Sequence, residues 1–429
     1  MNLRSTLGAT GRRYALTALA SAMLVTSTAL PAAFAAAPTP TAPATAAGPA
    51  AAPAATTSSA QPSAPSMSSV GLLSAIPAPA IAARSWVTID VTSDQVLAED
   101  RADERVEPAS LTKVMSAYLV FNALKEKRLT LDQTINVSQK AWRTGGSRMF
   151  IEPRKPVTVD ELIRGMIIQS GNDATVALAE AVSGTEEAFA TLMNQEALRL
   201  GLNNTHFVNS TGLPDPTHVT TARDLALLAK RLIQDHPAYY STYYKERQFT
   251  YNKISQPNRN RLLFLDPSVD GMKTGHTDAA GYCLIASAMR GDRRILTVMV
   301  GASSEHSRSQ ESLKLMNWSF QNFDTVRVYA ANQAVAEPPV WKGSAKTAKL
   351  GSPQPIWVTV PRGQAGNIKS GIERTDPLVA PLLPGQQVGT LKLTLNDKPV
   401  REVPLVVLEP VELAGIFGRA FDAMRLWFK

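Results

Sequence analysis

Three short motifs in the middle of the chain constrain most strongly what it can fold into. Ser-Leu-Thr-Lys at 110–113, Ser-Gly-Asn at 170–172 and Lys-Thr-Gly at 273–275 are the single occurrences of Ser-x-x-Lys, Ser-x-Asn and Lys-Thr-Gly in 429 residues. Any one of these patterns arises often by chance, so the signal lies in their order and in the spacing between them. A fold that uses all three must bring three distant segments to one place.

The sequence around each motif predicts a different kind of element. Apolar spacing and turn residues predict a helix over 111–125, two helices over 159–169 and 174–182, and a hairpin over 282–289 and 294–300. The first motif therefore begins a helix, the second lies in the turn between two helices, and the third opens a strand. This mixture of helices and strands predicts an α/β domain.

Ser110 and Lys113 form a candidate nucleophile and base. Residues three apart share one face of a helix, so the Ser110 hydroxyl and the Lys113 amine are expected to point into the same space. A serine hydroxyl needs a base to take its proton, and burial or a neighbouring cation such as Lys273 lowers the pKa of a lysine toward the neutral amine. We therefore expect Ser110 to attack and Lys113 to act as its base. Taken alone, the pair also fits a helix-capping serine followed by a surface lysine.

The other two motifs supply groups that such a reaction needs. A hydroxyl at Ser170 can relay a proton to the leaving nitrogen, and an amide at Asn172 can hold the base and the substrate backbone. Lys273 and Thr274 can bind a carboxylate, and Gly275 lets a substrate backbone approach the strand edge closely. Alone, each motif also fits a capped loop or an edge-strand lysine, but together the motifs predict a serine acyl-transfer site.

No competing catalytic or metal site stands out in the sequence. The five histidines have no metal-ligand spacing, and there is no His-Glu-x-x-His and no phosphate-binding glycine loop. No Gly-x-Ser-x-Gly elbow supports a Ser-His-Asp triad, although sequence alone leaves such a triad open. We therefore expect neither a metal nor a cofactor. The histidines are His206, His218, His236, His276 and His306.

The first 35 residues have the composition of an export signal. Arg4, Arg12 and Arg13 form a basic start without an acid, an apolar run follows over 14–30, and Ala-Phe-Ala at 33–35 offers the small residues that a signal peptidase reads. The apolar run is short for a membrane span, which takes about 20 residues. We expect a cleaved signal at 1–35, with an uncleaved anchor as the alternative.

Cysteine content and charge fit an exported protein without disulfides. Cys283 is the only cysteine, so no internal disulfide is possible and a packed core thiol is expected. The formal net charge of +8 falls to +5 without the three arginines of the signal. That balance is too mildly basic to indicate a nucleic-acid partner.

Composition divides the rest of the chain into further parts. Residues 36–75 are mostly Ala, Pro, Thr and Ser, which predicts a disordered linker. Residues 76–325 mix helical and strand patterns and are long enough for one large α/β domain with a buried core. Over 326–410, short β-prone runs such as 356–360 and 391–395 are separated by Pro and Gly, which predicts a small all-β domain.

The last segment, 411–429, predicts an amphipathic helix. Apolar and aromatic side chains recur at helical spacing on one face, and charged side chains take the other. Such a stripe with a basic opposite face suits a helix that lies in a membrane surface, and a helix docked on its own domain is the alternative. The apolar residues are Ile416, Phe417, Ala420, Phe421, Met424, Trp427 and Phe428.

From residue 76 onward the chain resembles the low-molecular-weight penicillin-binding proteins of the 5/6 type, which act as D-alanyl-D-alanine carboxypeptidases. The resemblance includes the β domain and the terminal helix. It implies an α/β (α+β) fold shared with serine β-lactamases: a five-stranded antiparallel sheet between helices, with a helical subdomain. The matching stretches are 96–99, 108–113, 162–166, 169–174, 203–207, 269–271 and 273–278.

The resemblance also implies roles for single residues. Ser110 would be acylated by the penultimate D-Ala of a peptidoglycan stem peptide, and the oxyanion hole would use the backbone N–H groups of Ser110 and His276. The loop at 142–150 looks shorter than in the family, and Ser147 within it could touch the substrate. Lys113 would act as the base for acylation and assist deacylation, and Ser170 and Asn172 would belong to the proton and hydrogen-bond network. The residues implied at the substrate carboxylate are Lys273, Thr274, Gly275, Arg259 and, as a further candidate, Arg308.

The implied setting is the bacterial cell wall. The resemblance implies a protein at the outer face of the inner membrane, held there by its terminal helix, that acts on stem peptides ending in D-Ala-D-Ala and is acylated by β-lactam antibiotics. Three alternatives remain: a β-lactamase, although the Glu-x-x-Leu-Asn pattern is missing after Ser170; a D,D-endopeptidase, which uses the same residues; and a non-catalytic cell-wall binding protein. The sequence leaves open the preferred peptide, the rate of antibiotic hydrolysis and the oligomeric state.

Overall fold

The computed structural model describes residues 76–374 and 376–415. The signal expected at 1–35, the linker at 36–75 and the part of the terminal helix from 416 onward lie outside the described residues. Residues 411–415, which were included in that helix, are not helical, because Val411 and Leu413 form isolated bridges to Leu382 and Gly343. Over the two described ranges, every helix is too short or too polar to span a bilayer.

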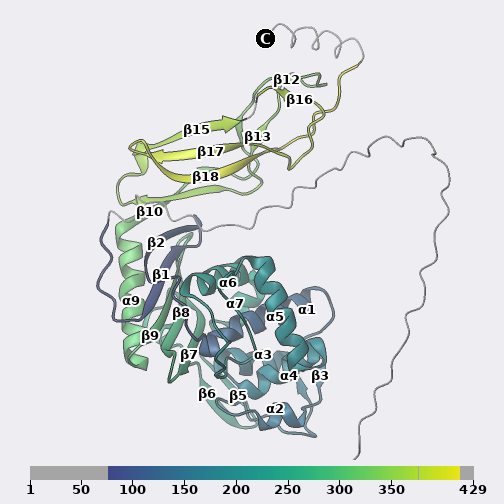
Figure 1. The fold of residues 1–429 in the computed structure, drawn as a ribbon, viewed down its shortest axis with the longest axis vertical. Helices are drawn as coiled ribbons and strands as arrows, with labels where there is room; N and C mark the ends of the chain where they lie inside the picture. The colour runs from purple at the N-terminus through teal and green to yellow at the C-terminus, as the bar shows by residue number, and fades with distance from the viewer. Residues whose placement is uncertain (1–75, 375, 416–429) are drawn as a thin grey trace, which may run out of the picture. The chain divides into compact units, whose positions relative to one another are not determined.

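One antiparallel sheet of five strands organises the first part of the described chain (Figure 1). In spatial order its strands are β2 (Gln95–Asp100), β1 (Ser85–Asp90), β9 (Arg293–Ala302), β8 (Gly281–Arg290) and β7 (Val269–Thr277). The long strands β8 and β9 carry buried apolar runs, as expected for strands that are covered on both faces. Strand β7 lies at the edge of this sheet and pairs with β8.

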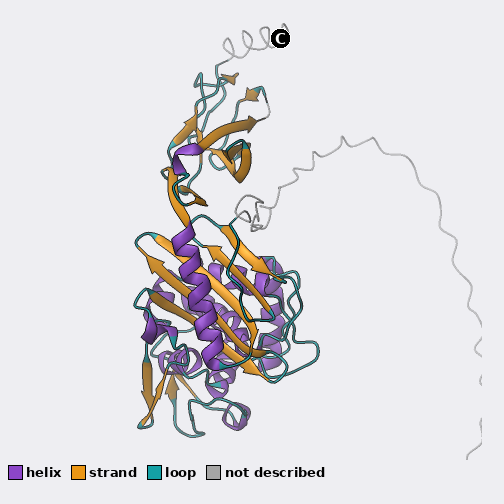
Figure 2. Ribbon diagram, turned by 90° about the vertical axis from the view of Figure 1, so that its left-hand side faces the viewer, coloured by secondary structure: helices purple, strands orange, loops and turns teal. Residues whose placement is uncertain are grey.

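Helices cover both faces of this sheet (Figure 2). On one face α9 (Glu305–Asn322) packs against β8 and β9, and on the other α6 (Ala222–Asp235) packs against β1 and β9. The short helix α8 (Leu262–Leu265) packs against β7. The remaining helices and two short strand pairs build a helical subdomain around a nearly fully buried α1 (Lys113–Lys125). These elements are the 3₁₀ helix η2 (Ala109–Thr112), α2 (Gln139–Arg143), α3 (Val159–Ile168), α4 (Asn172–Ser183), α5 (Glu186–Leu200), α7 (Pro237–Tyr243), β3 (Thr134–Ile135) with β4 (Val157–Thr158), and β5 (Gln248–Tyr251) with β6 (Ile254–Pro257).

The expected antiparallel sheet between helices is confirmed, but two local predictions were wrong in detail. Ser110 lies on the 3₁₀ helix η2, and the α-helix begins only at Lys113. The Lys-Thr-Gly motif does not open its strand, because β7 already begins at Val269, which pairs with Ala288 of β8. The Lys-Thr-Gly motif therefore lies inside a strand that is paired with β8 on both sides of the motif.

The C-terminal part of the described chain is an all-β domain, as expected. Along β17 (Gln387–Leu395) and β18 (Lys398–Val407) buried and more exposed residues alternate, so one face packs on a core and the other meets water. A five-stranded sheet has the order β11-β13-β18-β17-β15, and two further strand pairs complete the domain. The other elements are β10 (Phe323–Tyr329), β11 (Ala334–Ala336), β12 (Val340–Trp341), β13 (Leu350–Gly351), β14 (Ile356–Pro361), η3 (Ala365–Asn367), β15 (Ile368–Arg374) and β16 (Leu378–Val379).

Candidate active site

Ser110 and Lys113 lie side by side at the junction of η2 and α1. In a 3₁₀ turn the side chains of residues i and i+3 eclipse each other, and Nζ of Lys113 lies 3.0 Å from Oγ of Ser110. Ala109, just before the serine, has a φ of +47°, a left-handed conformation that is uncommon for alanine. A short strained turn thus presents the candidate nucleophile, and the first residue of a buried helix presents the candidate base.

The amine of Lys113 is enclosed by acceptors. The residue is 1% exposed, and its Nζ donates to Oδ1 of Asn172 at 2.7 Å and to the carbonyl O of Thr211 at 2.6 Å. A neutral lysine amine has two N–H groups and one lone pair. The two acceptors use the N–H groups, so the lone pair is left to face the Ser110 hydroxyl, as general-base catalysis requires.

The surroundings of Lys113 favour this neutral amine. Burial, and after it the positive charge of Arg259, lowers the pKa of Lys113 to about 7. The sequence suggested Lys273 as the neighbouring cation; Arg259 is a further cation that lowers the pKa of Lys113, and Lys113 and Lys273 also interact with each other. The pKa of Lys273 is itself lowered well below its usual range, first by its own burial and then by the charges of Lys113 and Arg259.

The second motif contributes a hydroxyl and an amide. Ser170 has a φ of +62°, and its buried Oγ has no hydrogen-bond partner among the described residues. Asn172 begins α4; its Oδ1 accepts from Lys113, and its Nδ2 donates to the carbonyl O of Gly145 at 2.7 Å. Its backbone N–H donates to the carbonyl O of Ser147 at 2.7 Å. Asn172 therefore links the base to the loop at 145–151.

Asp173 fixes this loop, a role that the sequence did not reveal. Its carboxylate has no exposure and accepts the backbone N–H groups of Met149 (2.8 Å), Phe150 (2.8 Å) and Ile151 (3.2 Å). The nearest cation is Arg148, with its Nε 3.9 Å away. An acidic residue in the first turn of a helix is common, because it interacts favourably with the helix dipole, so its position gave no reason to single it out.

The third motif lies on the free edge of β7, next to the nucleophile. A Cβ at Gly275 would lie 3.2 Å from the backbone N of Ser110, a contact tighter than side chains normally allow. The strand can come this close to η2 because the residue is glycine. Lys273 and Thr274 are both buried, and Nζ of Lys273 donates to the carbonyl O of Thr274 at 2.8 Å.

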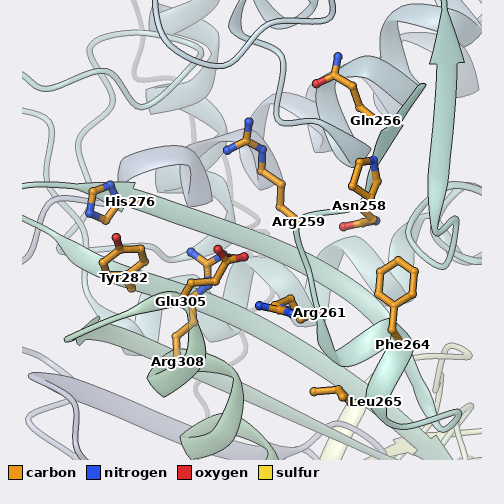
Figure 3. Close-up of a pocket in the computed structure, with 11 residues that line it drawn as sticks. Gln256, Asn258, Arg259, Arg261, Phe264, Leu265, His276, Tyr282, Glu305 and Arg308 are labelled. Atoms are coloured by element: carbon orange, nitrogen blue, oxygen red, sulfur yellow. Dashed lines mark hydrogen bonds and ion pairs between the residues drawn. The ribbon is translucent and has the colours of Figure 1, made fainter. Parts of the chain in front are cut away.

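His276, Arg259 and Arg308 line a cavity of about 740 Å³ (Figure 3). Arg308 is only 5% exposed, so it is not the solvated side chain that remained possible from the sequence. It donates to the carbonyl O of Gly275 at 3.4 Å and to Glu305 at 3.3 Å. The structure thus links Ser110 through Lys113 to Asn172, and places Gly275, which Arg308 contacts, against the turn that carries Ser110. Among the described residues, no hydrogen bond joins the hydroxyl of Ser170 to this group.

His218 supports the turn that carries Ser110, a role that the sequence did not reveal. Nε2 of His218 lies 2.9 Å from Oγ1 of Thr112, and Nδ1 of the same ring accepts the backbone N–H of Val208 at 3.3 Å. Because Nδ1 accepts a hydrogen bond, Nε2 is the protonated nitrogen. Burial lowers the pKa of His218 to about 4, so the ring is neutral. Residues 208–218, which carry the Thr211 carbonyl, are thereby tied to the turn that presents the nucleophile.

Neither a metal nor a cofactor was expected. Over 76–374 and 376–415 no group of three His, Cys, Asp or Glu side chains gathers where it could hold a metal ion. The arrangement can perform one kind of chemistry from its own residues: a serine hydroxyl, a lysine base of near-neutral pKa and a strand edge, with cations beside them.

Comparison with protein families gives two matches along the chain. The peptidase S11 family, described as D-alanyl-D-alanine carboxypeptidase, matches residues 73–304. The C-terminal domain of penicillin-binding protein 5 matches residues 323–413. The first match contains the three motifs and the second contains the β domain.

Individual relatives agree with these matches. D-alanyl-D-alanine carboxypeptidase DacC of Escherichia coli is 46% identical over 361 residues, which cover 82% of this chain and 90% of the relative. Penicillin-binding protein 5 of Haemophilus influenzae is 39% identical and superposes with a TM-score of 0.75 over 79% of this chain and 99% of that one. Penicillin-binding protein D2 of Listeria monocytogenes, solved with ampicillin bound, is 31% identical over 57% of this chain and 100% of that one, with a TM-score of 0.53.

Proposed function

The chain belongs to peptidase family S11, the D-alanyl-D-alanine carboxypeptidases, and we propose that it removes the terminal D-Ala of peptidoglycan stem peptides through an acyl-enzyme on Ser110. One observation carries the residue-level proposal. Nζ of Lys113 lies 3.0 Å from Oγ of Ser110, while two acceptors occupy its N–H groups. That is the geometry of a neutral amine poised to take the serine proton.

Acylation uses groups from all three motifs. Oγ of Ser110 attacks the carbonyl carbon of the penultimate D-Ala while Lys113 takes the hydroxyl proton. The backbone N–H groups of Ser110 and His276 stabilise the oxyanion; the contact between Gly275 and the turn that carries Ser110 supports this assignment. The hydroxyl of Ser170, which has no hydrogen-bond partner among the described residues, relays the proton from Lys113 to the leaving nitrogen. The C–N bond then breaks, and free D-Ala leaves.

By binding the terminal carboxylate of the substrate, the enzyme selects peptides with a free C-terminus. Lys273, Thr274 and Arg259 are proposed to bind it, with Arg308 as a further cation behind the strand edge. The support is their placement: the charges of Arg259 and Arg308 both act on Lys273, and Arg308 hydrogen-bonds the carbonyl O of Gly275. Charge-assisted hydrogen bonds of this kind are about twice as strong as neutral ones.

Deacylation completes the cycle when a water molecule, activated by Lys113, attacks the ester. A β-lactam is attacked in the same way, but its opened ring stays attached to the ester, so no leaving group clears the site for water. We therefore propose that β-lactams acylate Ser110 and are released slowly. The ampicillin complex of the Listeria relative supports this proposal.

We expect the rate of Ser110 acylation to rise with pH up to about 7 and to level off about one unit above. The reactive form of Lys113 is the neutral amine, and its pKa of about 7 means that the neutral fraction falls roughly tenfold for each pH unit below that value. The second-order rate constant for penicillin acylation, measured by stopped flow at constant ionic strength, gives the profile. A rate that stays flat from about pH 5 to about pH 9, in protein shown to be folded by circular dichroism, would contradict the role of Lys113.

Asp173→Asn is expected to lower the free energy of unfolding by about 1–3 kcal/mol. The asparagine amide replaces one acceptor oxygen with an NH₂ group, so at least one backbone N–H of the loop loses its acceptor. The loop at 145–151 then loosens around Asn172, and peptide turnover falls. Thermal unfolding and kcat measure the two effects. Asp132→Asn, at an exposed position, is the matched control and should change neither quantity. Wild-type stability and turnover in Asp173→Asn would show that the carboxylate does not hold the loop.

The location of the enzyme and its division into parts are also proposals. We propose an exported enzyme with a signal at 1–35, a linker at 36–75, a catalytic domain at 76–325 and a β domain at 326–410. The apolar stripe of the segment 411–429 supports attachment of its C-terminal part to the outer face of the inner membrane.

Mass spectrometry of the intact protein tests the proposed function. After incubation with benzylpenicillin we expect a single adduct of the mass of the antibiotic, located on the peptide that contains Ser110. With a peptide ending in D-Ala-D-Ala we expect the release of one D-Ala per peptide. Ser110→Ala should show neither result while keeping its thermal unfolding transition. An adduct on another residue, or hydrolysis by the Ser110→Ala variant, would refute the mechanism.

A further inference from the structure

One edge of the five-stranded sheet in the all-β domain is open. Strand β15 is the outermost strand of that sheet, and among the described residues it has a strand neighbour, β17, on one side only (Figure 1). The two strands pair regularly over all seven residues of β15, and residues 369–373 are exposed. Edge strands commonly carry a proline or a bulge, or are covered by a loop, which prevents pairing with another chain. Since β15 has no proline and no bulge, its free backbone groups can accept a further strand.

Charged side chains form a row across the exposed face of this sheet, and the row ends at the open edge. Nζ of Lys392, on β17, lies 3.6 Å from a carboxylate oxygen of Glu402 on β18 and 2.7 Å from one of Glu373 on β15. The side chain of Glu373 is 67% exposed, so it can meet a second cation. From β18 to β15 the charges therefore alternate as acid, base and acid. A strand added beyond β15 would continue the row with a base.

A second copy of β15 supplies that base. In an antiparallel pair of β15 strands centred on Gly371, Lys369 of each copy lies opposite Glu373 of the other. Such a pair has two-fold symmetry, so the contact occurs twice. A shift of two residues in either direction would place Gly371 opposite one of the two charges, so this register matches both of them. The Lys369 side chain is also 67% exposed.

From this self-complementarity we propose that β15 is a dimerisation edge, through which the five-stranded sheets of two copies of this chain join into one continuous sheet. The backbone hydrogen bonds of the added strand supply the attraction. The charges select the register and the partner more than they add affinity, because exposed ion pairs contribute little. The dimer edge lies outside the reacting groups and does not depend on the proposed function.

Cysteine cross-linking in cells that express the full chain tests the dimer. Gly371→Cys would place two thiols opposite each other with their Cα atoms about 4.5–5.5 Å apart, a distance that a disulfide can span. A Cβ at this position meets nothing within 4 Å, and the natural Cys283 is buried. After mild oxidation with copper phenanthroline we expect a disulfide-linked dimer on a non-reducing gel.

Gly366→Cys is the matched control for the cross-linking. Gly366 is exposed, and a Cβ there also meets nothing within 4 Å, but the residue lies in η3, before β15 begins. In the proposed dimer the two copies of this position would be more than about 20 Å apart. The variant should therefore stay monomeric on the same gel.

Reversal of the charges tests the register. Lys369→Glu alone puts acids opposite acids across the two-fold axis, and Glu373→Lys alone puts bases opposite bases. In the Gly371→Cys background each variant should cross-link about tenfold less than its parent, because two matched pairs become two repulsive ones. When the two variants are expressed together, one with a tag that changes its size, opposite charges meet again at both positions. The mixed dimer should then form at close to the parental level.

Four outcomes would overturn the proposal. The first is no dimer from Gly371→Cys in protein that keeps its thermal unfolding transition. The second is as much dimer from Gly366→Cys as from Gly371→Cys, and the third is a mixture of the charge variants that does not regain cross-linking. The fourth is a Gly371→Cys adduct with a different protein, identified by mass spectrometry. Release of D-Ala from peptides should be unchanged in every variant, so the dimer and the proposed function can fail separately.

Discussion

Lys113→Met is expected to lower the rate of Ser110 acylation on the order of 10²- to 10⁴-fold, the usual contribution of a positioned general base. Methionine has a similar length and no proton acceptor of the required strength, so the serine hydroxyl keeps its proton. Lys113→Arg should lose as much, because a guanidinium stays protonated at every accessible pH. The measurement is the second-order rate constant for penicillin acylation, followed by the appearance of the covalent adduct.

The two variants fail for different structural reasons, which makes the comparison informative. Methionine leaves the acceptors on Asn172 and Thr211 without their donor, whereas arginine keeps donors but supplies no lone pair. Lys155→Met is the control, since Lys155 is more than half exposed and pairs with Glu152. Acylation of both Lys113 variants at rates within about threefold of the wild type, with intact thermal unfolding, would exclude Lys113 as the base.

Gly212→Ala is expected to destabilise the protein by roughly 2–5 kcal/mol and to slow acylation by at least about tenfold. Gly212 has a φ of +84°, which is strained for alanine. A Cβ at this position would also overlap the carbonyl group of Ala109 and lie 2.9 Å from Oγ1 of Thr112. To relieve the overlap, the preceding Thr211 carbonyl must move away from Lys113. Thermal unfolding and the acylation rate give the two effects.

Gly184→Ala separates the two causes in Gly212→Ala. Gly184 has a φ of +82°, nearly the same as Gly212, but a Cβ there meets nothing within 4 Å. The control therefore carries the backbone strain alone and should lose only about 1 kcal/mol, with no change in the acylation rate. Equal effects of the two substitutions would show that close contact at Gly212 does not position the Thr211 carbonyl.

The pairing of Ser110 with Lys113 was predictable because it depends on local spacing. Residues three apart meet on any right-handed helical turn, so the prediction holds although the turn is 3₁₀ and not α. The arrangement of strands was less accessible. The sequence predicted the hairpin of β8 and β9, but not that β7 begins at Val269 or that the Lys-Thr-Gly motif lies inside it.

Local sequence patterns could not identify the groups that set the protonation state of Lys113. Thr211 is almost 100 residues away along the chain, and Arg259, whose charge lowers the lysine pKa, is farther still. Asp173 looks like an ordinary helix-start acid until the loop at 145–151 is folded onto it. These contacts depend on how the helical subdomain packs, which no spacing rule along the chain describes.

The sequence by itself determined the candidate reacting groups, the mixed α and β character of the first domain and the all-β character of the second, because motifs and apolar periodicity are local properties. Only the tertiary structure decided how those groups work. It buries the amine of Lys113, occupies both its N–H groups and places Arg259 nearby, and together these give a lysine with a pKa of about 7. The physical reason is that desolvation and charge–charge interactions depend on distances through space, and those distances exist only once remote segments have packed together.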